Sequence, residues 1–161
     1  YLVLDDSQLR NAGNWKMNPP LRDRSDREAL VEGLLDGTID MIATDHAPHT
    51  KEEKSHGLLG SPFGIVGLET AFPVLYTNLV LPGILRLEKL LFLLSESPRK
   101  RFQIPLQPDS FSVWDLSASY QIDPDRFLSM GRSTPFQAMQ VFGKCLATFV
   151  NSRQVYDACS E

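Results

Sequence analysis

The spacing of hydrophobic residues changes along the chain, and the first clear pattern is helical. An apolar stripe at helical spacing predicts an amphipathic helix, formed by Leu30, Val31, Leu34 and Leu35. Ser25 and Glu28 precede the stripe in the order S-x-x-E, so we expect a capping box there. Gly37 follows the stripe and is a natural residue to end the helix.

A short apolar run, TIDMIA at residues 38–43, follows this helix and predicts a buried strand. Asp45, His46 and His49 come directly after it, in the stretch ATDHAPHT. Functional residues of α/β folds lie at the carboxyl ends of strands. This stretch is therefore the first candidate for a site.

Further helices are predicted in the middle of the chain. One lies within FGIVGLETAFPVLYTNLV, where Pro73 starts or kinks it, and a second covers residues 85–94. A shorter helix begins with ESPRKRF. Residues 51–62, which precede these helices, are polar and contain Gly and Ser, and we interpret them as a mobile flap.

From about Ser110 the pattern becomes that of short strands. These runs are SFSVWDL, ASYQI, MQVF, CLATFV and RQVYD. Asn151 and Ser152 separate the last two runs and predict a hairpin turn. The pattern thus indicates an α/β first part and a mostly β second part.

Composition narrows the function classes. The chain has 161 residues, 42% of them hydrophobic and 22% charged, which is ordinary for a globular protein. A net charge of −4 gives no basic footprint for nucleic acid. No apolar run approaches the ~20 residues that span a bilayer, so we expect no membrane partner. Cys145 and Cys159 lack metal-ligand spacing, and we expect a reduced, cytoplasmic protein.

Asp45 carries the strongest chemical signal. A carboxylate at the end of a strand can bind a divalent metal through one oxygen and take a proton from metal-bound water with the other, since the pKa of that water falls to about 7. The structural alternative is that Asp45 caps the next turn and His46 packs beside it. Pro48 keeps His49 off a regular helix, so a defined turn orients its ring. That ring either donates to a substrate carboxylate or satisfies a loop carbonyl.

Other candidates surround this stretch. Asn18 precedes a proline pair, which places it on a turn, and its amide suits a ligand carboxylate or amide. Lys16 and Arg22 would form a rim that attracts anions, or a solvated one. Phe63 and Gly64 would present main-chain groups to a ligand, because Gly permits close approach, or would form a tight turn before a helix.

Three stretches in fixed order give the chain a family resemblance: KMNPPLR, DREALVEGLLDGTIDMIATDHAPHT and PFGIVGLETAFPVLYT. Together they resemble the C-terminal part of a bacterial dihydroorotase, of the amidohydrolase superfamily. The resemblance is close over residues 16–79 and weaker but continuous to the end. It implies the C-terminal portion of a metal-dependent (β/α)₈ TIM barrel in residues 1–105 and strands of a small β satellite domain in residues 106–161.

The resemblance also implies an activity, the reversible conversion of L-dihydroorotate to N-carbamoyl-L-aspartate in de novo pyrimidine (UMP) synthesis. Asp45 matches the residue that is both a metal ligand and the general acid/base. Asn18 and His49 match residues that hold the substrate. Phe63 and Gly64 match the turn whose backbone contacts the pyrimidine ring.

The family's other metal ligands have no counterpart in this sequence, which contains no His-x-His. We therefore expect one or two zinc ions whose remaining ligands lie in an N-terminal part of the barrel, in the same parent chain or in a second chain. We expect this chain to be inactive alone. Further expected partners are the small-molecule substrate, a second copy in a homodimer, and aspartate transcarbamoylase. His46 is expected to be structural support.

Two alternatives remain among related proteins: a cyclic amidohydrolase of the hydantoinase or allantoinase kind, and a dihydroorotase-like scaffold without catalysis. A small α/β module with an unrelated binding role is a third.

The sequence departs from the family pattern in its second half. Ser97 stands where Asn is usual before Pro, the Gly-rich approach to a strand is replaced by QPDSFSVWDL, and Ser133 replaces an Asn. We expect these changes to lie in the β region, away from the site.

Overall fold

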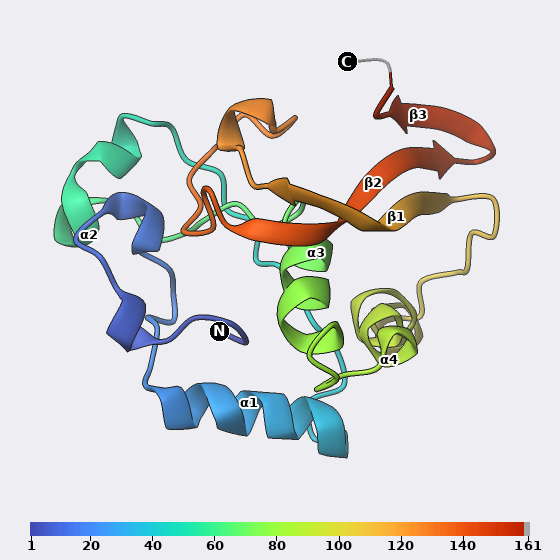
Figure 1. Cartoon of the computed structure of the whole chain (residues 1–161), viewed down its shortest axis with the longest axis horizontal. Coiled ribbons are helices and arrows are strands. Elements are labelled where there is room, and N and C mark those ends of the chain that lie inside the picture. The colour runs from blue at the N-terminus through green and yellow to red at the C-terminus, as the bar shows by residue number, and fades with distance from the viewer. Residues whose placement is uncertain (160–161) are drawn as a thin grey trace.

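A computed structural model describes residues 1–159 of the chain, and in it the structure is α/β, as the sequence predicts. The helices are α1 (Arg24–Asp36), α2 (Gly57–Gly60), α3 (Ala71–Leu75), α4 (Leu87–Leu91) and α5 (Ser97–Phe102). The strands are β1 (Phe111–Gln121), β2 (Gln140–Val150) and β3 (Arg153–Asp157). Figure 1 shows the sheet on one side of the molecule, α3 beneath it and α1 on the far side.

Wider helical turns extend the middle helices. The π-helical segment Tyr76–Val80 continues α3, and Phe92–Glu96 joins α4 to α5 without a break. The two helices predicted between residues 85 and 102 therefore form one rod. Pro73 lies near the start of α3, where a missing N–H is tolerated. No helix among residues 1–159 is long and apolar enough to cross a membrane.

Helix α1 forms where the apolar stripe predicts it, but its start differs. The side chain of Asp23 is the N-cap and accepts from the Asp26 N–H at 3.0 Å. Ser25 donates to the Asp23 carboxylate, and Glu28 forms a surface ion pair. The predicted Ser25–Glu28 capping box is wrong, because a carboxylate two residues earlier occupies the helix N-terminus. Gly37 ends the helix with φ 89°, as predicted.

The predicted strand at residues 38–43 is not a strand. Its one recorded main-chain bond to a distant element runs from the Ile42 N–H to the Leu93 carbonyl at 2.9 Å. A strand needs a hydrogen-bonded ladder, and none of the described residues forms one here. Ile39 and Ile42 still pack against the main core. The apolar pattern thus predicted the burial of this segment correctly, but its prediction of strand pairing was wrong.

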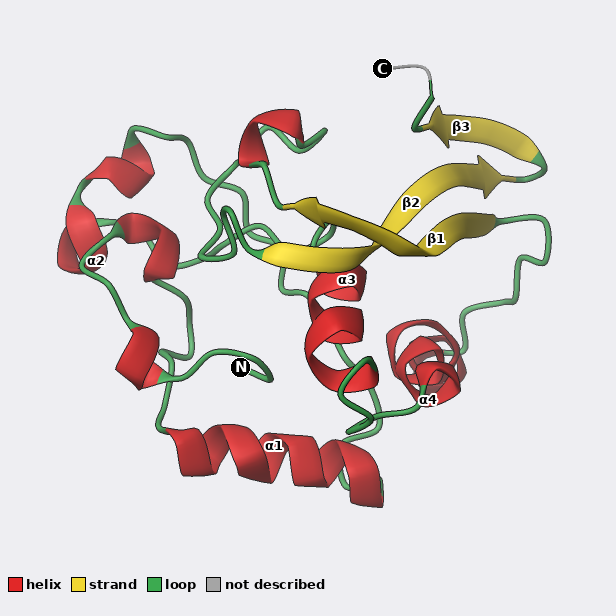
Figure 2. Cartoon of the chain, in the orientation of Figure 1, coloured by secondary structure: helices red, strands yellow, loops and turns green. Residues whose placement is uncertain are grey.

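The main core lies where α1, α3 and the α4–α5 rod meet. Its fully buried members are Leu34, Leu90 and Leu93. Phe72 joins this core to the sheet, since its ring centroid lies 4.4 Å from that of Trp114 on β1. Figure 2 shows the strands lying across the end of α3. Gly143 on β2 has φ 90°, and a Cβ there would lie 3.1 Å from the Phe72 ring, so glycine permits this close packing.

The sheet is antiparallel in the order β1-β2-β3. The four predicted runs between residues 110 and 150 merge into two long strands, each interrupted by a register shift. At the shift in β1, the Asp115 side chain accepts from the N–H groups of Ser117 and Ala118, which replaces bonds missing from the ladder.

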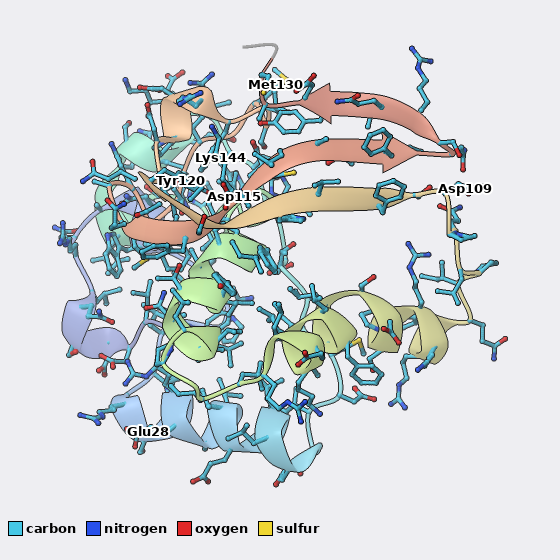
Figure 3. The ribbon with its side chains drawn as sticks, turned by 45° about the vertical axis from the view of Figure 1, so that its right-hand side comes forward. Glu28, Asp109, Asp115, Tyr120, Met130 and Lys144 are labelled. Carbon is cyan, nitrogen blue, oxygen red and sulfur yellow. The ribbon has the colours of Figure 1, made fainter. Side chains whose placement is uncertain are left out.

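The turn between β2 and β3 is the predicted hairpin. Asn151 and Ser152 have φ 50° and 62°, the positive values of a type I′ turn. Figure 3 shows Asp109 at this end of the sheet, where its carbonyl accepts from the Ser152 N–H at 2.8 Å. The same view places Glu28 on α1, on the far side of the molecule from the sheet.

An ion pair fastens the N-terminal segment to α1. Arg27 lies 2.8 Å from the buried Asp5 carboxylate and also donates to the Val3 carbonyl. Hydrogen bonds from Ser7 and the charge of Arg27 hold the pKa of Asp5 below its usual value.

Replacing the buried Leu90 by Ala will create a cavity in the main core. We expect the free energy of unfolding to fall by about 2–5 kcal/mol in chemical denaturation. Leu91→Ala is the matched control, since Leu91 is 46% exposed. An equal loss in both variants would contradict the assigned core.

Asp5→Asn will lower stability at neutral pH. A carboxyl whose pKa is lowered by folding stabilises the protein above its unfolded pKa, and this stabilisation is lost as pH falls through the folded pKa. We therefore expect the stabilities of parent and variant to converge below about pH 4. Denaturation at several pH values measures this, with the exposed Asp6→Asn as control. A constant difference at all pH values would contradict it.

Candidate active site

A cavity of about 170 Å³ lies beside α3 and is lined mainly by apolar groups. Its wall comes from five stretches of chain and one aromatic residue: residues 1–4, 17–18, 42–45 and 64–67, positions 70, 71, 74 and 75 of the turn and helix, and Phe136. Asp45, Asn18 and Gly64 all line it, so the structure brings three of the predicted site residues together. His49 and Phe63 are not in its lining.

Asp45 is exposed and has φ 47°, a left-handed conformation that Asp adopts more readily than most residues. Among residues 1–159, its carboxylate has no recorded hydrogen bond or ion pair. Burial and the nearby charge of Asp45 raise the pKa of Tyr1, whose hydroxyl donates to the Pro19 carbonyl at 2.7 Å. The carboxylate is thus open to a ligand, and the turn-capping alternative finds no support.

His46, the residue after Asp45, bonds to two neighbouring loops. Its Nδ1 accepts from the N–H groups of Gly67 and Leu68, at 3.1 and 3.3 Å. An Nδ1 that accepts leaves the proton on Nε2, which donates to the Ser129 hydroxyl at 3.2 Å. His46 therefore joins three separate loops, which is the structural support expected of it.

His49 makes a loop contact, one of the two possibilities left open by the sequence. Its Nε2 lies 2.8 Å from the Phe63 carbonyl and donates to it, and its Nδ1 lies 3.6 Å from the Glu53 carboxylate. Hydrogen bonds from Thr50 lower the pKa of Glu53, with a smaller contribution from His49.

The expected anion-attracting rim is partly occupied by internal contacts. The Lys16 ammonium donates to the Leu59 carbonyl at 2.6 Å and lies 4.6 Å from the centroid of the Phe63 ring. Arg22 lies near Asp26 in an exposed pair.

Lys54 is a functional candidate that the sequence analysis missed. It is only 8% exposed, and its ammonium donates to the carbonyls of Gly64, Pro62 and Lys16, at 2.7, 2.9 and 3.3 Å. Burial lowers the pKa of Lys54, and the nearby Lys16 lowers it further. In the sequence it stands within the polar run KEEKS, where nothing separates it from a solvated lysine.

Position 64 requires glycine, because of its backbone conformation and its close neighbours. It has φ 119°, and a Cβ there would lie 2.6 Å from that of Ala47. Its N–H donates to the Lys16 carbonyl at 3.0 Å. The turn at Phe63 and Gly64 can therefore pack against both neighbouring loops only with glycine at this position.

The segment between β1 and β2 reaches back to the site. The Ser133 carbonyl accepts from the N–H of Val66, which lines the cavity, and the Glu69 carboxylate accepts from the N–H groups of Leu128 and Ser129. The expectation that position 133 lies away from the site is therefore wrong.

Within residues 1–159, no group of three or more His, Cys, Asp or Glu side chains is close enough to hold an ion. The open carboxylate of Asp45 fits a single ligand of a metal whose other ligands come from elsewhere.

Comparison with known proteins gives consistent results. No family model matches the chain. Curated relatives do: the dihydroorotase of Brevibacillus brevis is 54% identical over 164 residues, and that of Geobacillus sp. is 49% identical over 163 residues. Each match covers 97% of this chain and 38% of the relative. The resemblance to bacterial dihydroorotases is confirmed. The chain spans less than half the length of the curated relatives it matches.

Solved structures confirm the fold. An L-hydantoinase (dihydropyrimidinase) from Arthrobacter aurescens matches 88% of this chain and 34% of its own, with a TM-score of 0.80 and 32% identity. A D-hydantoinase from Bacillus sp. AR9 matches 98% of this chain and 38% of its own, with a TM-score of 0.82 and 21% identity. These are TIM-barrel amidohydrolases, so the predicted class, part of such a barrel followed by β strands, is confirmed.

His46→Ala will remove an acceptor from two main-chain N–H groups. We expect the free energy of unfolding to fall by about 1–3 kcal/mol, the cost of leaving such groups unpaired. His56→Ala is the matched control, because His56 is exposed and its recorded hydrogen bond within residues 1–159 stays inside its own loop. Chemical denaturation of both variants decides, and equal stability of His46→Ala and the parent would contradict the bracing role.

Proposed function

We propose that this chain forms the C-terminal part of a dihydroorotase, an enzyme that hydrolyses and re-forms the cyclic amide of L-dihydroorotate. The observation that carries the proposal is the identity of about 50% to curated dihydroorotases over nearly the whole chain. The cavity supports it, because the open Asp45 carboxylate and the Asn18 amide share an otherwise largely apolar wall. Such a wall suits a small ring with a few polar groups.

In this proposal Asp45 is both a metal ligand and the catalytic acid/base. When bound, a divalent metal, which we take to be zinc as one or two ions, lowers the pKa of water and polarises the ring carbonyl. Asp45 accepts the proton of the attacking water on its free oxygen. As the ring C–N bond breaks, Asp45 returns that proton to the departing nitrogen, and the carbonyl carbon keeps the hydroxyl. In ring closure the same transfers run in reverse.

The remaining site residues bind the substrate in this proposal. Asn18 offers a donor and an acceptor from the cavity wall, and the main chain at Gly64 borders the ring. Phe63 and His49 form the adjacent rim, where the His49 ring and the Phe63 carbonyl are already joined. His49 reaches a substrate carboxylate only by turning from that carbonyl.

The proposal extends to the rest of the enzyme. Residues 1–105 belong to the barrel and residues 106–161 to a β satellite, of which residues 160–161 lie outside the described part of the chain. The other metal ligands come from an N-terminal part of the barrel, so the chain is inactive alone. The enzyme acts in pyrimidine synthesis in the cytoplasm, as a homodimer and beside aspartate transcarbamoylase.

A second candidate is hydrolysis of a hydantoin ring. The 32% identity to an L-hydantoinase favours it, although the identity to dihydroorotases is higher. Both rings present a cyclic amide to the same carboxylate, so rates on the two substrates separate the candidates.

The test is a full-length hybrid enzyme in which this chain replaces the matching segment of the Brevibacillus brevis dihydroorotase. We expect the zinc-loaded hybrid to hydrolyse L-dihydroorotate, and to do so faster than hydantoin. Asp45→Asn will lower kcat by about 10²–10⁴-fold, because it removes the proton acceptor. Asp40→Asn is the matched control, since Asp40 lies five residues earlier in an exposed ion pair with Arg101.

Two results would overturn the proposal. A folded, zinc-loaded hybrid without dihydroorotate turnover favours the scaffold alternative, and preferred turnover of hydantoin favours the second candidate. Equal kcat in the parent hybrid and in Asp45→Asn would show that Asp45 is not the catalytic acid/base.

A further inference from the structure

The turn at residues 62–64, hereafter the rim turn, has all three of its carbonyls bonded to side chains of one loop. Lys54 donates to the carbonyls of Pro62 and Gly64, at 2.9 and 2.7 Å. His49 donates to the Phe63 carbonyl between them, at 2.8 Å. The rim turn has no helix or strand bonds of its own, so these contacts determine its path.

Lys54 also fixes the rim turn to a second loop. The Lys16 carbonyl accepts from the Lys54 ammonium at 3.3 Å and from the Gly64 N–H at 3.0 Å. Asn18 follows Lys16 by two residues, with the buried Met17 between them. One ammonium thus joins the loop that carries Asn18 to the turn that carries Gly64, and both of these residues line the cavity.

An ammonium ion suits this position for an electrostatic reason. Carbonyl oxygens that converge on one point repel one another unless a cation lies between them. The lysine head group offers three donors, one for each carbonyl. No ion pair among residues 1–159 includes Lys54, so the main-chain oxygens are its recorded partners. Its burial lowers its pKa, and a buried charge without a carboxylate is retained only where such bonds hold it.

Lys54 itself does not line the cavity. Its position one layer behind the wall separates it from the groups that would touch substrate. A purely structural lysine would support the fold as a whole, whereas the recorded hydrogen bonds of this ammonium within the described residues all go to the rim turn and the Lys16 carbonyl.

We propose that Lys54 is a positioning residue that sets substrate affinity, because it holds Gly64 and Asn18 at their places in the cavity wall. It takes no part in proton transfer. This inference rests on the proposed function, since it names the residue that arranges the same site.

The experiment uses the full-length hybrid described above, with zinc bound and L-dihydroorotate as substrate. Lys54→Met removes the ammonium at similar length, and Lys54→Gln keeps two donors without the charge. Lys51→Met is the matched control, since Lys51 is an exposed lysine of the same loop. For Lys54→Met we expect KM to rise about tenfold or more with kcat within about threefold, because the lost interaction acts on binding and not on the chemical step. Lys54→Gln should show a smaller rise in KM, and Lys51→Met should match the parent.

Amide hydrogen exchange provides an independent readout. We expect the N–H groups of residues 63–67 to exchange faster in Lys54→Met, while those within residues 71–80 exchange at the parent rate. A general loss of stability would accelerate both.

The outcomes separate the two proposals. A parent hybrid without dihydroorotate turnover overturns the proposed function. An active parent with unchanged KM in folded Lys54→Met overturns the inference alone, and so does an equal fall of kcat and kcat/KM, which would place Lys54 in the chemical step. If neither Lys54→Met nor Lys54→Gln folds, Lys54 supports the whole domain and the inference is wrong.

Discussion

The three hydrogen bonds from the Lys54 ammonium to main-chain carbonyls are the constraint on which the cavity wall depends. Residues 37–52 and 61–70 contain no helix or strand, yet they carry most of the candidate site. Their buried main-chain groups need partners, because an unpaired buried carbonyl or N–H costs free energy. Side chains supply those partners here, with Lys54 at the rim turn and His46 at the Gly67 turn. The wall is therefore built by bonds from side chains to the main chain.

The same kind of bond separates the candidate metal ligand from the supporting residues in the stretch after residue 44. Within residues 45–49, the two histidines are committed to loop groups, His46 through Gly67 and His49 through Phe63. Asp45 alone among the three has no such bond within the described chain. A carboxylate free of local partners keeps its lone pairs for a metal or a proton, while the adjacent braces hold its backbone in place. In the proposed function, the chemical role of Asp45 and the supporting roles of the two histidines thus fall to neighbouring residues.

Patterns of local spacing predicted the elements well. The apolar stripe located α1, Gly37 its end, and Asn151-Ser152 the hairpin turn, because each depends on residues close in sequence. Local spacing does not predict an element whose deciding partner is remote in the sequence. The run at residues 38–43 reads as a strand by composition, but pairing requires a neighbour that composition does not report.

The candidate site shows the same division. Residue type and turn chemistry indicate Asp45 and Asn18 as candidates, and both line the cavity. Lys54 was missed, because its burial arises from contacts with Lys16, Pro62 and Gly64, and no local pattern marks a buried lysine inside a polar run. The choice of His49 between a substrate and a carbonyl was likewise undecidable from spacing, since it depends on where residue 63 folds back.

Ser133 departs from the family pattern and lies beside the site, yet its main-chain contact leaves the cavity wall intact. Its main-chain carbonyl holds the Val66 N–H at 2.9 Å, and a main-chain bond persists whichever side chain the position carries. The cost of the substitution falls on the side chain, because the Ser133 hydroxyl is buried without a hydrogen-bond partner within the described residues. That cost is one of stability, of the order of 1–3 kcal/mol for an unpaired buried polar group. A main-chain bond holds the chain at Val66 and therefore the cavity wall. The substitution at position 133 leaves that bond in place.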